Sequence, residues 1–257
     1  MTFYPLNTII KSGKHKGRIG YYDDNDCGKK AYVYWGSMVY NLDTCTEIPL
    51  KNLSSIITTY DLVKRSNVLG NQIGRLRGGF GQPDYELIAN LLGEQDFVKD
   101  LLMKKYLDFA FNKPEKRKKI FISHKHNSKF EKENEIDYAM CLATDLTTIG
   151  YEVWYDNKTI SLGQSIPAEM NEGIETSDFM IMLITKEYFE SNFCNDEWRA
   201  FYHKNNNSSP NKIIPIVLED GVRIPSLLSH YKYYDFSKER NYNKMFESIA
   251  KSIKESK

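Results

Sequence analysis

Three patterns of apolar and polar positions follow one another along the chain. Residues 1 to about 55 contain short alternating runs, such as KAYVYW at 30–35, separated by the turn-rich segments GKHKG, DDNDCGKK and NLDT. Alternation with a period of two is typical of half-buried strands. We therefore expect a small, strongly bent β-sheet or barrel, and we predict a β-rich, SH3-like domain over residues 1–60.

The alternation weakens between residues 56 and 82, which are polar and end in RLRGGFGQP. Glycine has a high backbone entropy cost in a regular element, and Pro83 suits the first turn of a helix, so we expect a hinge here. From residue 84 to 111 apolar residues recur at helical spacing, until KPEKRKK breaks the pattern. A hinge and a helical connector are predicted over residues 61–116.

Beyond residue 117, short apolar runs alternate with helix-like stretches. The runs are IFIS, YEVWYD, FMIMLIT and IIPIVL; the first helix-like stretch covers 133–149 and the last lies near Lys244. Unbroken apolar runs are typical of strands buried on both faces, and the helices supply the crossovers that a parallel sheet needs. We predict an α/β domain over 117–257, a flavodoxin-like, doubly wound, five-stranded parallel sheet.

The topology of such a sheet indicates where a ligand would bind. For the strand order 2-1-3-4-5, the order reverses between the first and third strands, and ligands bind at the carboxyl ends of the strands there. This directs attention to the residues after Ser123 and after Thr185.

The segment TKEYFESNFCNDEWRAFYH follows the third strand and contains our leading candidate residue, Glu197. A carboxylate among aromatic residues is costly to bury without a partner or a ligand. From the periodicity alone, the segment could instead be only partly helical there, or Glu197 could cap a backbone amide or pair with a nearby Arg or Lys. The apolar residues that fall on the same helix face at 100° per residue are Phe193, Cys194, Trp198, Phe201 and Tyr202.

Composition and charge narrow the classes of partner. The 35 Lys and Arg residues balance 34 Asp and Glu residues, leaving a formal charge of +1, so no bulk field favours nucleic acid or an anionic membrane. No run approaches the roughly 18 consecutive apolar residues of a membrane span, and the N-terminus lacks the features of a signal peptide. We therefore expect a cytoplasmic protein without membrane association. Its cysteines, Cys27, Cys45, Cys141 and Cys194, lie far apart and are expected to be reduced thiols.

Other chemistries are disfavoured by spacing. His124 and His126 have no evident third ligand, so we expect no metal. The glycines of LGNQIGRLRGGFGQ match neither a dinucleotide nor a P-loop motif, and no G-x-S-x-G elbow occurs. Cys194 has no evident His partner as a nucleophile, and its place in the aromatic arc favours packing. The basic runs RLRGG and KPEKRKK are more typical of solvated linkers than of nucleic-acid sites.

Four segments resemble, in order, the signature boxes of TIR domains: KKIFISHKHNS, GYEVWYDNKTISLGQSI, IETSDFMIMLITKEYFESNFCNDEW and KIIPIVLED. The resemblance covers roughly residues 117–255. It implies cleavage of the nicotinamide–ribose bond of NAD+, which is then a substrate and not a cofactor. In TIR domains with this activity the glutamate of an S-x-W-C-x-x-E box is essential, and here Ser191, Phe193 in place of Trp, Cys194 and Glu197 match that box.

The resemblance also implies roles for residues outside this box. Ser123, His124 and Lys125 would contact the nucleotide and Trp154 would lie near the bound base, with Ser191 and Cys194 also lining the substrate site. Some active members carry arginines where this chain has Lys125 and His126, and a lysine cannot make the bidentate contact of an arginine with phosphate.

The loop at 157–165 corresponds to the segment through which TIR domains commonly contact another copy, and it includes Asn157, Lys158 and Gly163. An ordinary surface loop remains the alternative reading of these residues.

Taken together, the resemblance implies an enzyme of bacterial antiphage immunity that depletes NAD+ or makes an ADP-ribose-type signal. We expect it to self-associate on activation, with a trigger or effector acting through the N-terminal domain. The alternative is a catalytically silent TIR module that acts only by TIR–TIR contact, although such a module needs no acid at Glu197. A receiver-like domain is disfavoured because FISHKHNS lacks an acidic cluster.

Overall fold

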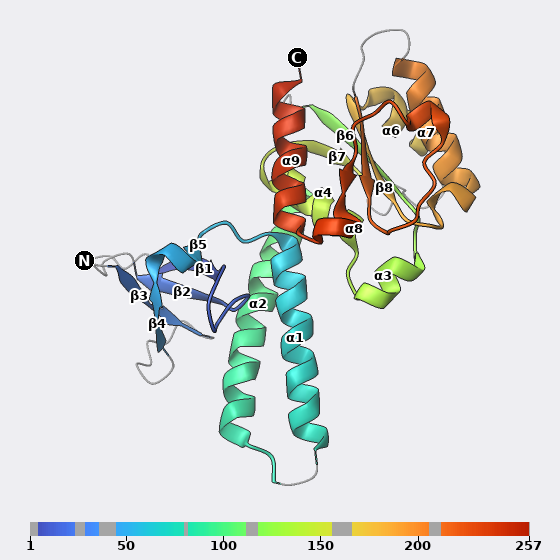
Figure 1. The fold of residues 1–257 in the computed structure, drawn as a ribbon. Helices are drawn as coiled ribbons and strands as arrows, with labels where there is room; N and C mark the ends of the chain where they lie inside the picture. Colours follow the sequence, from blue (N-terminus) through green and yellow to red (C-terminus); the bar gives the residue numbers. More distant parts are fainter. Residues whose placement is uncertain are drawn as a thin grey trace. The chain divides into compact units, whose positions relative to one another are not determined.

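The computed structural model describes residues 5–23, 29–35, 45–79, 82–111, 118–155, 166–205 and 212–256. The chain divides into two compact units, residues 1–106 and 107–257. Figure 1 gives the labels of the elements in both units.

The first unit contains a five-stranded antiparallel sheet with the order β4-β3-β2-β1-β5. In β3 the burial alternates, with Ala31 and Val33 buried and Lys30 and Tyr32 exposed, as expected for a period of two. The predicted strand-rich region is therefore confirmed, whereas its likeness to an SH3 domain stays a prediction. The strands are β1 (Pro5–Ile10), β2 (Ile19–Asp23), β3 (Lys30–Tyr34), β4 (Cys45–Pro49) and β5 (Leu53–Ser54), with the 3-10 turn η2 (Leu50–Asn52) before β5.

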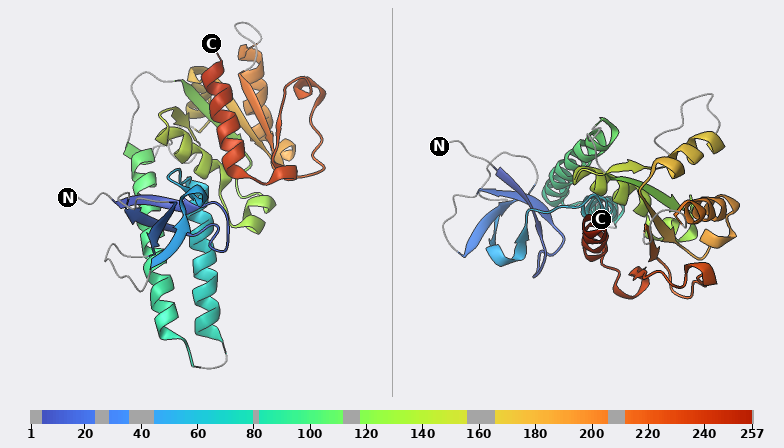
Figure 2. Two further views of the ribbon diagram at one scale, coloured as in Figure 1. Left: turned by 60° about the vertical axis from the view of Figure 1, so that its left-hand side comes forward. Right: turned by 90° about the horizontal axis from the view of Figure 1, so that it is seen from above.

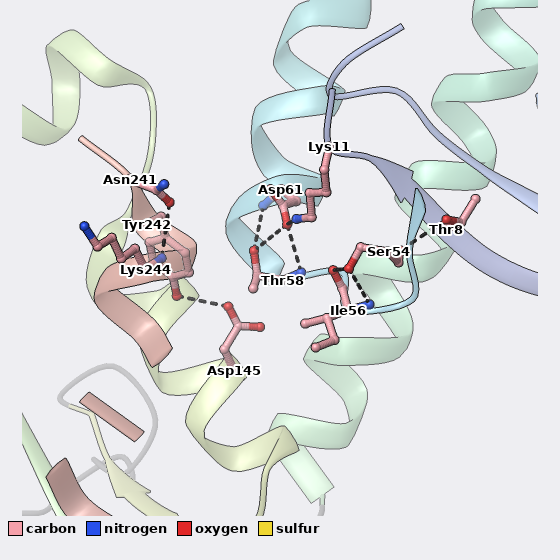
Figure 3. A network of polar contacts seen from close by, with 10 residues as sticks. All are labelled: Thr8, Lys11, Ser54, Ile56, Thr58, Asp61, Asp145, Asn241, Tyr242 and Lys244. Atoms are coloured by element: carbon pink, nitrogen blue, oxygen red, sulfur yellow. Dashed lines mark hydrogen bonds and ion pairs between the residues drawn. The ribbon is translucent and has the colours of Figure 1, made fainter. Parts of the chain in front are cut away.

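Two long helices, α1 (Thr59–Gly78) and α2 (Tyr85–Phe111), follow the sheet. The helix predicted from residue 84 is confirmed, but the hinge predicted over 56–82 is wrong, because most of that segment forms α1. A capping box starts α1: the Thr58 side chain accepts from the Asp61 amide, and the Asp61 carboxylate accepts from the Thr58 amide (Figure 3). Burial of Leu62, Leu69 and Ile73 outweighs the entropy cost of the glycines in the helix.

The sheet of the first unit has apolar clusters on both faces. Ile9 and Ile19 join Leu62, Leu69 and Val98 in one cluster, so this face packs against both helices. The other cluster, made of Ile10, Val33 and Ile48, contains residues of three strands of the sheet. The first cluster therefore joins the sheet to the helices, whereas the second packs the strands against one another.

The second unit contains a five-stranded parallel sheet with the order β10-β9-β8-β6-β7. Numbered within the unit, this is the order 2-1-3-4-5, which confirms the doubly wound α/β prediction. β8 is buried along its whole length, and β6 is buried from Ile120 onward, as their unbroken apolar sequences predict. The strands are β6 (Lys119–His124), β7 (Glu152–Trp154), β8 (Phe179–Ile184), β9 (Ile213–Val217) and β10 (Tyr234–Asp235).

Helices cover both faces of this sheet: α4 and α9 lie on one face, and α6 and α7 lie on the other (Figure 1 and Figure 2). A buried hydrogen bond of 3.0 Å from the Tyr242 hydroxyl to Asp145 Oδ2 joins α9 to α4 (Figure 3). The helices are α3 (Lys129–Asn134), α4 (Tyr138–Thr148), α6 (Ile166–Thr176), α7 (Asn192–Asn205), α8 (Phe236–Glu239) and α9 (Tyr242–Glu255), with the 3-10 turns η3 (Tyr188–Glu190) and η4 (Ser226–Leu228).

The single helix predicted over 133–149 is two helices in the structure. Glu135 adopts a left-handed conformation with φ 54° and ends α3, and Asp137 then caps the start of α4 by accepting from the Met140 amide. The apolar periodicity runs through this break, so it did not reveal the cap. Among the described residues, none of the helices combines the length and the apolar character needed to cross a membrane.

Candidate active site

Glu197 and Ser123 meet at the carboxyl end of the first strand of the parallel sheet. Ser123 is the fifth residue of β6, and strand alternation directs its side chain to the face covered by α7. Glu197 lies in α7 and is only 7% exposed. The Ser123 hydroxyl donates to Glu197 Oε2 over 2.5 Å, so the buried carboxylate has a short hydrogen bond at the predicted switch point.

Tyr188, in η3, contacts the Ser123 hydroxyl from another side. Its hydroxyl lies 2.5 Å from the Ser123 oxygen. Because the one proton of Ser123 goes to the carboxylate, the tyrosine must be the donor to serine. Burial, with smaller contributions from Cys194 and Glu197, raises the pKa of Tyr188 well above its usual value, so the phenol keeps its proton. Tyr188, Ser123 and Glu197 thus form an ordered chain of hydrogen bonds.

Cys194 links the first turn of α7 to β6. Its thiol donates to the backbone oxygen of His124 over 3.3 Å. Burial raises the pKa of Cys194 to about 12, with a further rise from Glu197 and opposing effects of Ser191 and Lys125. The thiol is therefore neutral near pH 7. It holds α7, and with it Glu197, against the end of the strand.

Ser191 and Phe193 complete the region before Glu197. The Ser191 hydroxyl accepts from the Cys194 amide over 3.4 Å, so Ser191 caps the start of α7. Phe193 departs from the predicted arc, because its side chain is 63% exposed. It lies about 100° around the helix from Cys194, at the edge of the buried stripe. The apolar residues of α7 that are buried are Cys194, Trp198 and Phe201.

His124 and Lys125 diverge from Ser123, although the three are consecutive. The His124 ring stacks on Tyr155 at 5.3 Å and meets the His126 ring edge-on at 4.1 Å. Lys125 is half-buried, and its ammonium donates to the backbone oxygen of His126 over 3.3 Å. Because Lys125 acts electrostatically on the Cys194 thiol, its charge lies close enough to influence the start of α7.

Trp154 belongs to the packing beneath the site. Its ring stacks on Phe121 with centroids 4.5 Å apart and planes 9° from parallel. Gly173 of α6 approaches the indole so closely that a Cβ built there would lie 2.6 Å from Trp154 Cε2. Only glycine allows this approach, so the Trp154 ring is held between a strand and a helix.

Thr185 directly follows β8 and is a polar residue for which the sequence predicts no specific role. Its side chain is only 3% exposed, and its hydroxyl has no hydrogen-bond partner among the described residues. A buried hydroxyl without a partner is rare and calls for an explanation. The sequence feature that could have identified it is its position directly after a central strand, at the edge of the sheet where ligands bind.

The predicted self-association residues, Asn157, Lys158 and Gly163, lie outside the described residues. Among the described residues, Cys45, Cys141 and Cys194 form no disulfide bond with one another. Within the described ranges, no group of three or more His, Cys, Asp or Glu side chains is arranged to hold a metal ion.

Comparison with known proteins supports what the topology indicates. The family model described as TIR domain matches residues 120–250, which is about half of the chain. The chain belongs to the TIR domain family. The matched residues begin in β6 and end in α9, so the match includes Ser123, Tyr188 and Glu197.

Several curated TIR proteins are similar to this chain. The NAD(+) hydrolase TirS of Staphylococcus aureus is 30% identical over 140 residues, which are 52% of this chain and 48% of that protein. The NAD(+) hydrolase PdTIR of Paracoccus denitrificans is 29% identical over 97 residues, 38% of this chain and 30% of that protein. A probable 2′ cyclic ADP-D-ribose synthase, TcpO of Methanobrevibacter olleyae, is 25% identical over 79 residues, 31% of this chain and 21% of that protein. The chain thus spans about half the length of the first of these relatives and less of the others.

The TIR unit therefore places a carboxylate in a largely dehydrated setting and orients it by a fixed donor. In such a setting a charge interacts strongly with any charge that develops nearby. This arrangement suits stabilisation of a cation more than nucleophilic attack by the neutral Cys194 thiol.

Proposed function

We propose that the TIR unit cleaves the nicotinamide–ribose bond of NAD+, with Glu197 as the essential carboxylate. The observation that carries the proposal is the ordered chain from Tyr188 through Ser123 to Glu197, buried at the carboxyl end of β6. Similarity to curated NAD(+) hydrolases supports the choice of substrate.

The chemistry matches one oriented carboxylate. As the C–N bond breaks, its electron pair leaves with neutral nicotinamide, and positive charge develops at the ribosyl carbon. Glu197 stabilises that charge, or holds the ribose hydroxyls so that the carbon faces the nucleophile. When water attacks, it forms the new C–O bond and releases one proton, which gives ADP-ribose. Glycosidases use carboxylates against a similar cation.

The remaining residues at this edge would bind the nucleotide. Lys125, whose positive charge acts on the Cys194 thiol at the start of α7, would contact a phosphate. Thr185 offers a buried hydroxyl, and Phe193 offers an exposed aromatic ring beside the site. Ser191 and Cys194 act mainly by fixing the first turn of α7, so their contribution would be to the position of Glu197.

The decisive experiment compares wild type with Glu197→Gln, incubated with NAD+, and follows nicotinamide and all ADP-ribose products by chromatography with mass detection. Glutamine keeps the size and a carbonyl acceptor for Ser123 but removes the charge. We expect a loss of at least about 10²-fold in kcat, since a preorganised electrostatic contact has an effect of that order. Asp196→Asn is the matched control, because Asp196 is exposed on the same helix.

The outcomes separate the proposal from its alternative. Activity in wild type and Asp196→Asn but not in Glu197→Gln supports catalysis by Glu197. Equal activity in wild type and Glu197→Gln would refute this role. If none of the three proteins releases nicotinamide at any protein concentration, the result would favour a TIR module that acts only by contact with other TIR copies.

We further propose that copies of the TIR unit associate through the loop at 157–165 and that association completes the active site. Specific activity should then rise with protein concentration, and Lys158→Glu should flatten that rise. A trigger acting through the first unit would control the association. The proposed setting is bacterial antiphage immunity, in which the activity depletes NAD+ or generates an ADP-ribose-type signal.

A further inference from the structure

The first unit contains a pocket of about 510 Å³ whose lining is strongly cationic. It is formed by the turn between β1 and β2, by the start of β4 and by both helices. Pockets of this volume suit small organic ligands. None of its residues belongs to the TIR unit, so the pocket is separate from the site proposed above.

In the turn between β1 and β2, two glycines with positive φ flank a run of cationic side chains. Gly13 and Gly17 adopt φ of +88° and +83°, which side-chain-bearing residues rarely tolerate. The Gly17 amide donates to the Ile10 oxygen over 2.8 Å, which closes the turn. Between and beside these glycines the sequence GKHKGR places Lys14, His15, Lys16 and Arg18 at the pocket.

Two arginines in the pocket are fixed by one buried carboxylate. Glu94 is fully buried, and its oxygens lie 2.6 Å from Arg18 Nη2 and 2.8 Å from Arg65 Nη2. The Arg18 guanidinium also lies over the Trp35 ring, 3.8 Å from its centroid. The Trp35 indole in turn donates to the Thr46 hydroxyl over 2.9 Å. The arginines are therefore held in place before any ligand binds.

The charges of the pocket do not cancel. Among the described residues, the lining contains the cations Lys14, Lys16, Arg18 and Arg65, and the carboxylate that pairs with them is Glu94, which binds both arginines; these five groups together carry three net positive charges. Among the described residues, Lys14 and Lys16 form no ion pair, whereas Lys11 pairs with Asp61 and Lys30 with Glu47. Burial, Arg18 and Lys14 lower the pKa of His15, in keeping with a positive local field.

We infer that this pocket binds a small ligand that carries phosphate groups and has the size of a nucleotide. Fixed guanidinium groups match the geometry of phosphate oxygens, and the two lysines add mobile positive charge at the rim. The amide of Asn90 and the side chain of Leu91, both in the lining, provide polar and apolar contacts for the rest of the ligand. This inference does not depend on the activity proposed for the TIR unit.

The test is calorimetric titration of the full chain with ATP and, separately, with inorganic pyrophosphate. Lys14 and Lys16 are replaced together by alanine, because both are exposed and their loss leaves the Glu94 ion pairs intact. The matched control replaces Lys99 and Lys104 of α2, which are exposed and do not line the pocket. We expect ATP affinity to fall by at least about tenfold in the first variant and to stay unchanged in the control.

Binding of pyrophosphate that is also lost in the first variant would show that the phosphates are the recognised group. Equal ATP affinity in wild type and the first variant would place binding elsewhere and overturn the inference, as would the absence of binding by both probes. A third titration uses a short 5′-phosphorylated DNA oligonucleotide, and binding of DNA alone would assign the pocket to nucleic acid instead.

Discussion

The Ser123 hydroxyl oxygen lies 2.5 Å from Glu197 Oε2, which joins the end of the central strand β6 to the middle of α7. The two residues are far apart in the sequence, and the parallel sheet brings them together. Tyr188 fixes the serine from its other side at 2.5 Å. The orientation of the carboxylate is therefore determined by the fold and not by a flexible loop.

If Glu197 acts as proposed, Ser123→Ala should reduce kcat for NAD+ cleavage by about 10- to 10²-fold, because it removes the donor that orients this carboxylate. Tyr188→Phe should reduce kcat less, because Ser123 can still donate to Glu197. Steady-state kinetics would separate kcat from KM in both variants. A double variant, Ser123→Ala with Glu197→Gln, should be no slower than Glu197→Gln alone, and full additivity would contradict the positioning role.

Cys194 should be dispensable for chemistry. Burial raises its pKa to about 12, so almost no thiolate exists at pH 7 to 8. We predict that Cys194→Ala keeps activity within about tenfold of wild type, at a cost of about 2 kcal/mol in stability, because it removes a buried group that anchors α7. Denaturant unfolding and nicotinamide release measure the two effects.

Alkylation provides an independent check of this prediction. Iodoacetamide at pH 8 should label the half-buried Cys45 well before Cys194, as read by mass spectrometry of peptides. Rapid labelling of Cys194 that abolishes activity in step would instead indicate a reactive thiol.

Much of the TIR unit could be predicted from its sequence, since apolar runs without alternation identify strands buried on both faces. The expected strand order 2-1-3-4-5 places Ser123 and the end of β8 at the switch point. Helix periodicity also placed Glu197 on the buried side of α7, and it is 7% exposed. The buried strands and the buried face of α7 could be predicted because apolar runs and helical periodicity are local properties of the sequence.

Features that depend on tertiary contacts were beyond the sequence. The segment before Gly79 looked like a hinge because its glycines disfavour a helix, but packing of Leu62 and Leu69 outweighs that preference. The pairing of Tyr188 with Ser123 and the burial of Glu94 between two arginines join residues with no shared motif. The periodicity of apolar positions along the sequence does not indicate which polar side chains will meet in the folded protein.

Substitution of Thr185 tests whether its buried hydroxyl binds a ligand. Its hydroxyl is buried without a partner among the described residues, so Thr185→Val keeps the shape and removes the unpaired group. We predict that the free energy of unfolding rises by about 1 kcal/mol, because a buried polar group without a partner is destabilising. If the hydroxyl binds NAD+, KM should rise as stability rises. A marked loss of stability would show that the hydroxyl is paired in the folded protein.

Glu131, in α3, should make the stability of the TIR unit depend on pH. Burial, reinforced by Asp137, raises its pKa from 4.5 to about 7, against smaller opposing effects of Ser128 and His126. Because the folded state holds this proton more tightly than the unfolded state, the contribution of Glu131 to stability is full below pH 4.5. It is then lost as the pH rises toward 7. Glu131→Gln, which stays neutral, should therefore gain stability relative to wild type between pH 5 and 8.

The measurement is the Tm of wild type and Glu131→Gln across this pH range, with Glu133→Gln as the control, because Glu133 is exposed on the same helix. Subtracting the control removes the effect of lost negative charge, so the remaining difference reports the buried carboxyl. A difference in Tm that widens with pH follows from the raised pKa. A constant difference would mean that Glu131 titrates alike in the folded and unfolded chain, and that burial beside Asp137 has no effect on its ionisation.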